Sequence, residues 1–220
     1  MRQTDDVQSM STSHGCRQGI SPVRERLKRE TADLHRRLET ELGLLDPNLS
    51  LARYRRILEL FFGFYAPLEG VMVHVASAGL ALGFPLRDRT GLIESDLRSI
   101  GLSRREVAGL PRCCALPRLS SSAELAGCLY VIEGACLGGR FIAPVLRERL
   151  GVATSSGASF FTGDAEGTPA RWSLFLAWLE GLVRGGAVTD EIVTSARATF
   201  LACAEWVERS RISNCQPLTD

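Results

Sequence analysis

The chain has 220 residues, of which 45% are hydrophobic and 23% charged, and its formal net charge is +1. This length suits one domain with an ample core. The near-neutral charge excludes the strong field that nucleic-acid or anionic-membrane binding requires. No apolar stretch reaches the roughly 18 uninterrupted residues of a membrane span, so none is expected.

Seven segments between residue 21 and residue 208 have helical signals, and none alternates as a strand does. The sequence therefore predicts an all-α fold, a single-domain helical bundle of about seven to nine helices over residues 21–212. The stretch from 151 to 168 is rich in Gly, Ser and Thr and is predicted to be an exposed loop. The expected helical segments are 22–42, 51–75 with a kink at Pro67, two short helices at 90–100 and 103–110, 122–150, 169–184 and 190–208.

The two ends of the chain are predicted to be tails. Residues 1–20 are polar, which predicts a disordered N-terminal tail, and they lack the apolar run of a signal peptide. Residues 213–220 form a short C-terminal tail. The seven cysteines are irregularly spaced without a CxxC pair, which argues against a zinc site. Free thiols without a secretion signal predict a cytoplasmic protein.

The first helix places Lys28, Thr31, His35 and Glu39 on one stripe, because they are spaced by three and four residues. A neutral imidazole on such a face can be the axial ligand of haem iron, and Glu39 can hold its other ring nitrogen. Lys28 is placed to reach a haem propionate. The alternative is a core histidine bonded to a backbone carbonyl. His74 is a second, weaker candidate for the ligand.

The long helix carries Gly134, Gly138 and Gly139 in its middle. Each glycine in a helix costs about 1 kcal/mol relative to alanine. Three of them predict that the backbone approaches something flat, such as a haem face. The alternative is close helix–helix packing through small residues.

Both helices resemble those of one family, haem oxygenase (heme oxygenase). The stretch 27–39 is similar to its proximal helix, and the stretch 130–140 resembles its distal helix. The stretch 61–69 looks like the bacterial branch that supplies biliverdin to bacteriophytochromes. The resemblance covers roughly residues 21–210. It implies that His35 ligates the iron, that Gly138 and Gly139 are the catalytic distal residues, and that the haem site also includes Lys28, Thr31, Glu39, Tyr130, Gly134, Ala135 and Arg171.

The family's chemistry is implied by the same resemblance. Haem serves as cofactor and as substrate, and it is cleaved to biliverdin, CO and iron. A ferredoxin or reductase would supply the electrons, since the chain has no Gly-rich dinucleotide fingerprint. A bacteriophytochrome would be the partner that receives the product.

One position departs from the family pattern. Many members have a distal aspartate where this chain has Ala135, and Glu133 points about 200° away on the helix. A second propionate contact is expected from Arg171, with Arg184 as the other candidate. The alternative functions are a non-catalytic haem-binding or haem-sensing protein on this fold, and a helical-bundle protein that binds no haem.

Overall fold

The computed structural model describes residues 21–80, 83–163 and 168–212, and the predicted tails 1–20 and 213–220 lie outside them. The described residues form eight α-helices and one 3₁₀ turn, without a strand, so the all-α prediction is confirmed. The elements are α1 (Pro22–Leu42), α2 (Leu51–Ser77), α3 (Arg89–Ser99), α4 (Arg104–Ala108), α5 (Ser122–Leu150), η1 (Thr154–Ser156), α6 (Ser159–Thr162), α7 (Thr168–Arg184) and α8 (Thr189–Ile212).

Several predicted boundaries are confirmed by capping contacts. The Ser50 hydroxyl accepts a hydrogen bond from the Arg53 amide at the start of α2. Gly151 ends α5 in the left-handed conformation, with φ 68°, which glycine adopts without strain. Helix α2 is one continuous helix that contains Pro67, where the sequence predicts a kink. Helix α8 continues four residues past its expected end at Glu208.

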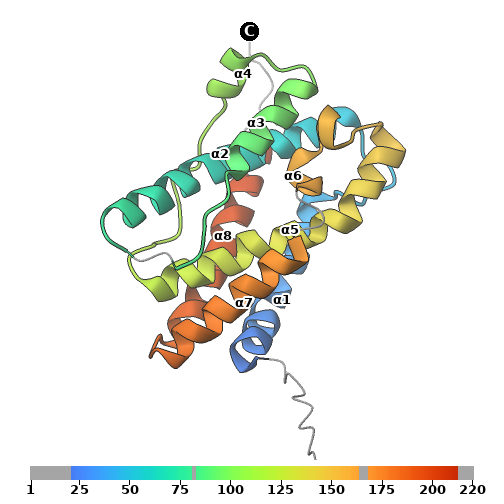
Figure 1. Ribbon diagram of the computed structural model, residues 1–220. Coiled ribbons are helices and arrows are strands. Elements are labelled where there is room, and N and C mark those ends of the chain that lie inside the picture. Colours follow the sequence, from blue (N-terminus) through green and yellow to red (C-terminus); the bar gives the residue numbers. More distant parts are fainter. Residues whose placement is uncertain (1–20, 81–82, 164–167, 213–220) are drawn as a thin grey trace, which may run out of the picture.

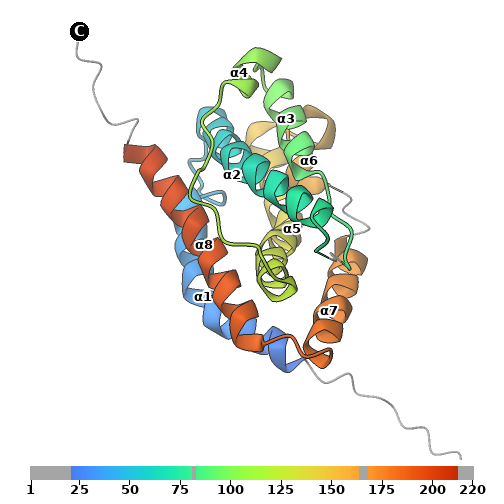
Figure 2. The same cartoon turned by 90° about the vertical axis from the view of Figure 1, so that its left-hand side faces the viewer.

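Helices α1 and α8 lie side by side and run in the same direction (Figures 1 and 2). An ion pair joins Arg26 to Asp190 at their beginnings, and another joins Arg37 to Glu208 near their ends. Helix α5 packs on the same α8. A Cβ on Gly127 would overlap the Ile192 carbonyl oxygen, so this glycine allows the two backbones to touch. Helix α8 thus supports both α1 and α5.

The predicted loop between α5 and α7 is partly helical, which corrects the sequence interpretation. Within it, η1 and α6 are short, and Phe160 and Phe161 of α6 are buried at 8% and 6% exposure. The buried Asp96 carboxylate of α3 accepts hydrogen bonds from the Ser159 and Phe160 amides at 2.7 and 2.8 Å. Burial of the two phenylalanines and the hydrogen bonds to Asp96 stabilise a helical turn here, although the local Gly, Ser and Thr composition favours a loop.

By length and composition alone, α2 and α5 are apolar enough to cross a membrane, a property that they share with core helices of soluble proteins. Their buried side chains belong to the common hydrophobic core, for example Tyr54 and Phe64 of α2 and Leu125 and Leu129 of α5. Burial within the bundle therefore accounts for part of their apolar character.

Candidate functional site

His35 lies in the middle of α1 with slightly more than half of its side chain exposed. Its Nδ1 is 3.2 Å from the Glu39 carboxylate one turn further along, and the two side chains are 54% and 65% exposed. With the proton on Nδ1, the neutral ring donates to Glu39 and leaves the Nε2 lone pair available to a metal. This arrangement differs from the alternative of a core histidine that bonds a backbone carbonyl.

The His35 ring also touches α8. It meets Phe200 edge to face, with ring centroids 5.8 Å apart and an interplanar angle of 79°. This contact and the Glu39 contact restrict the orientation of the imidazole from two sides. His74, the competing candidate, is exposed in the last turn of α2. The described part of the chain holds no group of three or more His, Cys, Asp or Glu side chains suited to a metal ion.

Thr31 and Tyr130 connect α1 to α5. Thr31 is buried, and its hydroxyl donates to the Leu27 carbonyl at 2.7 Å. Burial raises the pKa of Tyr130, and a side-chain hydrogen bond with Thr31 and the positive charge of Arg24 partly offset that rise. The contact lies one turn before His35 on α1 and one turn before Gly134 on α5. Helices α1 and α5 both begin in the lower part of the molecule as drawn and rise from there (Figures 1 and 2).

The face of α5 centred on Gly138 is incompletely covered. A Cβ on Gly138 would meet only Ile142 Cδ1 at 4.0 Å, and one on Gly134 would make ordinary contact with Trp172 at 3.9 Å. Ala135, on the same side, is exposed. Phe141 is 62% exposed, although a large apolar side chain gains from burial. This face is therefore apolar, nearly free of side-chain bulk and open to a flat partner.

Gly139 has a different environment from Gly138. It is buried, and a Cβ there would overlap the carbonyl oxygen of Phe161 in α6. Adjacent helical residues point about 100° apart, so the two glycines cannot share one contact. Sequence reasoning placed both on the haem face. The structure instead packs Gly139 against α6 and leaves Gly138 on the open face.

Glu133 lies on the flank of α5 away from Ala135, as the helical geometry predicts. Its carboxylate is 2.6 Å from Arg89 Nη2 and accepts two hydrogen bonds from Arg171, at 2.7 and 2.8 Å. Burial alone would raise the pKa of Glu133, but the hydrogen bonds and charges of the two arginines outweigh it and lower that pKa. Arg89, whose side chain is only 1% exposed, was not anticipated from the sequence.

Arg171 is held by this ion pair. Besides the two bonds to Glu133, its Nη2 donates to the Pro85 carbonyl at 2.6 Å, and its guanidinium lies 4.5 Å from the Phe84 ring centroid. Arg184 lies 3.7 Å from Glu180 and is 73% exposed. The structure therefore gives both predicted propionate contacts a protein partner. Lys28, the third, is exposed on α1.

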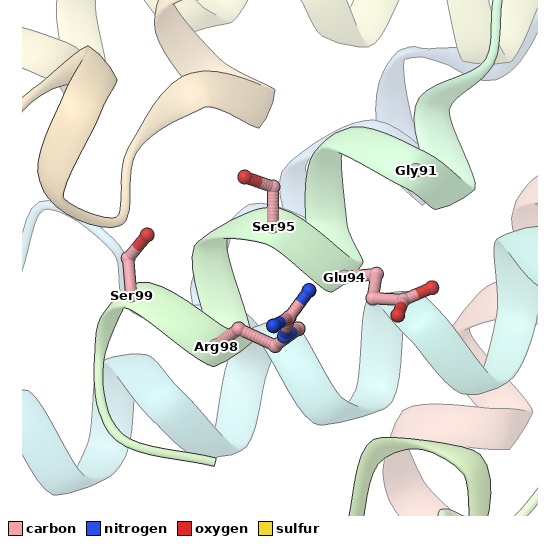
Figure 3. A pocket seen from close by; sticks show the side chains of 5 residues that line it. All are labelled: Gly91, Glu94, Ser95, Arg98 and Ser99. Atoms are coloured by element: carbon pink, nitrogen blue, oxygen red, sulfur yellow. The ribbon is translucent and has the colours of Figure 1, made fainter. Parts of the chain in front are cut away.

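Two surface hollows lie elsewhere. One, of about 400 Å³, is lined by Gly91, Glu94, Ser95, Arg98 and Ser99 along the outer face of α3 (Figure 3). The other, of about 540 Å³, lies between the start of α3 and the η1–α6 segment. Neither includes a residue of α1 or α5. The first is a polar face of one helix that includes no histidine or cysteine and no metal-binding set, so the candidate chemistry stays with His35 and the Gly138 face.

An exposed histidine on α1 with one nitrogen held by a carboxylate, and an apolar glycine face on α5, suit a flat, metal-bearing ligand. The family comparison names the class of protein. Residues 21–209 match the model of the family described as Heme oxygenase. A protein named Heme oxygenase from Xanthomonas campestris pv. campestris (strain 8004) is 32% identical over 158 residues, which cover 72% of this chain and 88% of that protein. The chain belongs to the haem oxygenase family, and its activity is haem degradation.

Proposed function

We propose that this protein binds haem between the His35 stripe of α1 and the Gly138 face of α5, and opens the ring to biliverdin, CO and iron. The single observation that carries the proposal is the His35–Glu39 contact. It leaves Nε2 of an exposed, oriented imidazole available as the iron ligand. When bound, haem would supply both the iron that activates oxygen and the carbon ring that is oxidised. A ferredoxin or reductase would supply the electrons.

On the opposite side of the ring, the Gly138 face would limit what can approach the iron. Backbone and small side chains at Gly134, Ala135 and Gly138 would lie against the ring without adding an acid. Glu133, the nearest carboxylate, is kept ionised between two arginines and points away. Arg140 is exposed and stacks on Phe141 at 4.7 Å. Protons would therefore travel through ordered water and backbone carbonyls on this face.

The experiment is a haemin titration of the wild type and of His35→Ala, followed by ascorbate in air. The wild type should form a Soret band that gives way to a broad band toward the red, with release of CO. His35→Ala should lose the starting spectrum, whereas His74→Ala, a control at an exposed histidine, should retain it. Failure of the wild type to bind haemin would refute the proposal.

Ala135 favours one second candidate, a non-catalytic haem-binding or haem-sensing protein. Among the described residues, no carboxylate lies on the Gly138 face of α5. A Soret band that persists when a competent reductase is supplied would support this candidate. If the protein does turn over haem, Ala135→Asp should change the pH dependence of turnover. An unchanged pH profile would argue against a water network at that position.

The proposal extends to the location of the enzyme and to the partner that receives its product. Biliverdin from a cytoplasmic enzyme of this kind would be the chromophore of a bacteriophytochrome, which is supported by the resemblance of residues 61–69 to that branch of the family. Reconstitution of a phytochrome apoprotein with the reaction product tests the link, since only the correct bilin isomer would give a photoconvertible holoprotein.

A further inference from the structure

Two of the three tryptophans and one of the three tyrosines belong to a single row of aromatic rings. Tyr130 of α5 meets Trp172 of α7, with ring centroids 5.8 Å apart. Trp172 stacks on Phe175 at 5.3 Å, and Phe175 meets Trp178 at 5.8 Å. Phe84 lies 5.6 Å from Phe175 and 6.0 Å from Trp178. All these distances are those of direct ring contact. We call the five residues the aromatic row.

One end of the aromatic row lies at the candidate haem site. A Cβ on Gly134, which belongs to the open face of α5, would be 3.9 Å from the Trp172 ring. The Tyr130 side chain is hydrogen-bonded with Thr31 of α1, one turn before His35. The members of the row that reach the site are therefore an indole and a phenol.

The other end of the aromatic row lies near the surface. Trp178 is partly exposed, and its indole nitrogen lies against Gly83 in the segment before α3. Trp172 and Trp178 are six residues apart, about 9 Å along a helix axis. Phe175, which touches both indoles, is fully buried. The row thus connects the haem site to the surface through buried side chains.

The chemistry of these side chains suits the transfer of single electrons. Indole and phenol lose an electron far more readily than the benzene ring of phenylalanine, and contact between neighbouring rings lets an electron pass along a row. Haem supplies redox chemistry wherever it is bound, and peroxide that meets it leaves oxidising equivalents at the site. Oxidising equivalents that are not removed damage nearby cysteine and methionine side chains.

Resting on the proposed function, we propose that the aromatic row delivers electrons to the haem site and so removes oxidising equivalents left by peroxide. Hydrogen peroxide is the oxidant, and it takes up two electrons and two protons to become two waters. Each electron leaves Trp172, which also releases its indole N–H proton. The electron vacancy passes to Trp178, where ascorbate, the reductant, refills it. Ascorbate gives up two electrons and two protons and becomes dehydroascorbate, so the reaction balances.

The test replaces each indole by a benzene ring, which keeps an aromatic side chain but removes the oxidisable group. The variants are Trp172→Phe and Trp178→Phe. The matched control is Trp206→Phe, because Trp206 is also partly exposed but lies on α8, where its indole N–H donates to the Leu60 carbonyl at 2.8 Å. Each protein is loaded with haemin, mixed with equimolar hydrogen peroxide and frozen for electron paramagnetic resonance. Wild type grown with ring-deuterated tryptophan identifies the radical without any substitution.

The wild type should give an organic-radical signal that narrows with deuterated tryptophan and disappears with ascorbate. Trp172→Phe should lose most of this signal, and Trp206→Phe should retain it. Trp178→Phe should trap the radical one step earlier, so peptide mapping should find more oxidised Trp172 than in the wild type. A packing role alone would leave the radical signal unchanged in variants that still bind haemin.

Several results would overturn the inference. These are a signal that deuterated tryptophan does not alter, an unchanged signal in Trp172→Phe, or an equal loss in Trp206→Phe. Wild type that binds haemin but forms no tryptophan radical would overturn the electron path and leave the proposed function standing. Wild type that binds no haemin would overturn the proposed function, and this inference with it.

Discussion

The two adjacent glycines of α5 provide the sharpest test of the site, because one extra methyl should have opposite effects at the two positions. Replacing glycine by alanine inside a helix stabilises it by about 0.5–1 kcal/mol when the methyl has room. At Gly138 the nearest atom to the new Cβ is 4.0 Å away. Gly138→Ala should therefore stabilise the haem-free protein by about that amount. For a domain of this size the Tm should rise by about 1–4 °C.

At Gly139 the same methyl would overlap the Phe161 carbonyl oxygen. This is a backbone atom, and its segment is anchored by Asp96 and by the Tyr54 hydroxyl, which donates to the Gly157 carbonyl at 2.7 Å. Overpacking against an anchored segment costs about 1–3 kcal/mol, which outweighs the gain in helix propensity. Gly139→Ala should therefore lower the Tm by several degrees.

Haemin titration completes the comparison. Gly138→Ala should bind haemin about tenfold more weakly despite its higher Tm, because the methyl lies on the open face. Gly139→Ala should retain most of its affinity at a temperature where it is folded. Thermal melting at 222 nm and Soret titrations measure both quantities. A lower Tm for Gly138→Ala, or undiminished haemin affinity in that variant, would refute the assignment of Gly138 to the haem face.

Three further predictions concern charged side chains. Glu39→Ala should lower haemin affinity about tenfold and shift the iron–histidine stretching frequency, because it removes the acceptor that orients His35; an unchanged frequency would argue against that role. Glu133→Gln should destabilise the fold by about 3 kcal/mol in urea unfolding at pH 7. The folded state lowers the pKa of Glu133, so the ionised carboxylate stabilises the fold fully above the ordinary pKa of 4.5. This stabilisation is lost as the pH falls through the lower, folded-state pKa. The unfolding free energies of the wild type and Glu133→Gln should therefore converge in acid. Arg171→Ala should lose about 2–3 kcal/mol of stability while Arg89 remains, with little change in haemin affinity; a tenfold weaker affinity would restore Arg171 as a propionate contact.

Local sequence signals were sufficient to predict every described α-helix except α6. The ends of α1 and α5 coincide with Ser-Pro and Gly signals whose chemistry acts within a few residues. Helix α6 was missed for the corresponding reason. Its stability comes from Asp96, which is over sixty residues earlier in the chain, and from the burial of Phe160 and Phe161. The adjacent phenylalanines in an otherwise polar stretch were the one available signal, because two such side chains are rarely left in water.

Contacts between residues far apart in the sequence also limit what can be predicted for single residues of the candidate site. Helical geometry alone placed Glu133 opposite Ala135, and the structure agrees. The same geometry separates Gly138 from Gly139 by about 100°, so the two glycines face different surroundings. Which glycine packs against another helix depends on the position of α6, and residue spacing along α5 does not predict that position.

Cations are the hardest residues to assign from sequence in a chain whose basic residues are nearly all arginine. The sequence alone does not distinguish Arg171 from Arg24, since each is an arginine near the start of a helix. One has a buried carboxylate partner and stabilises the fold, whereas the other lies at the positive end of a helix without an ion-pair partner among the described residues. The ion-pair partner of a cation can lie far away in the sequence. Only a folded structure therefore distinguishes a cation that forms an ion pair within the protein from one that remains available to a ligand.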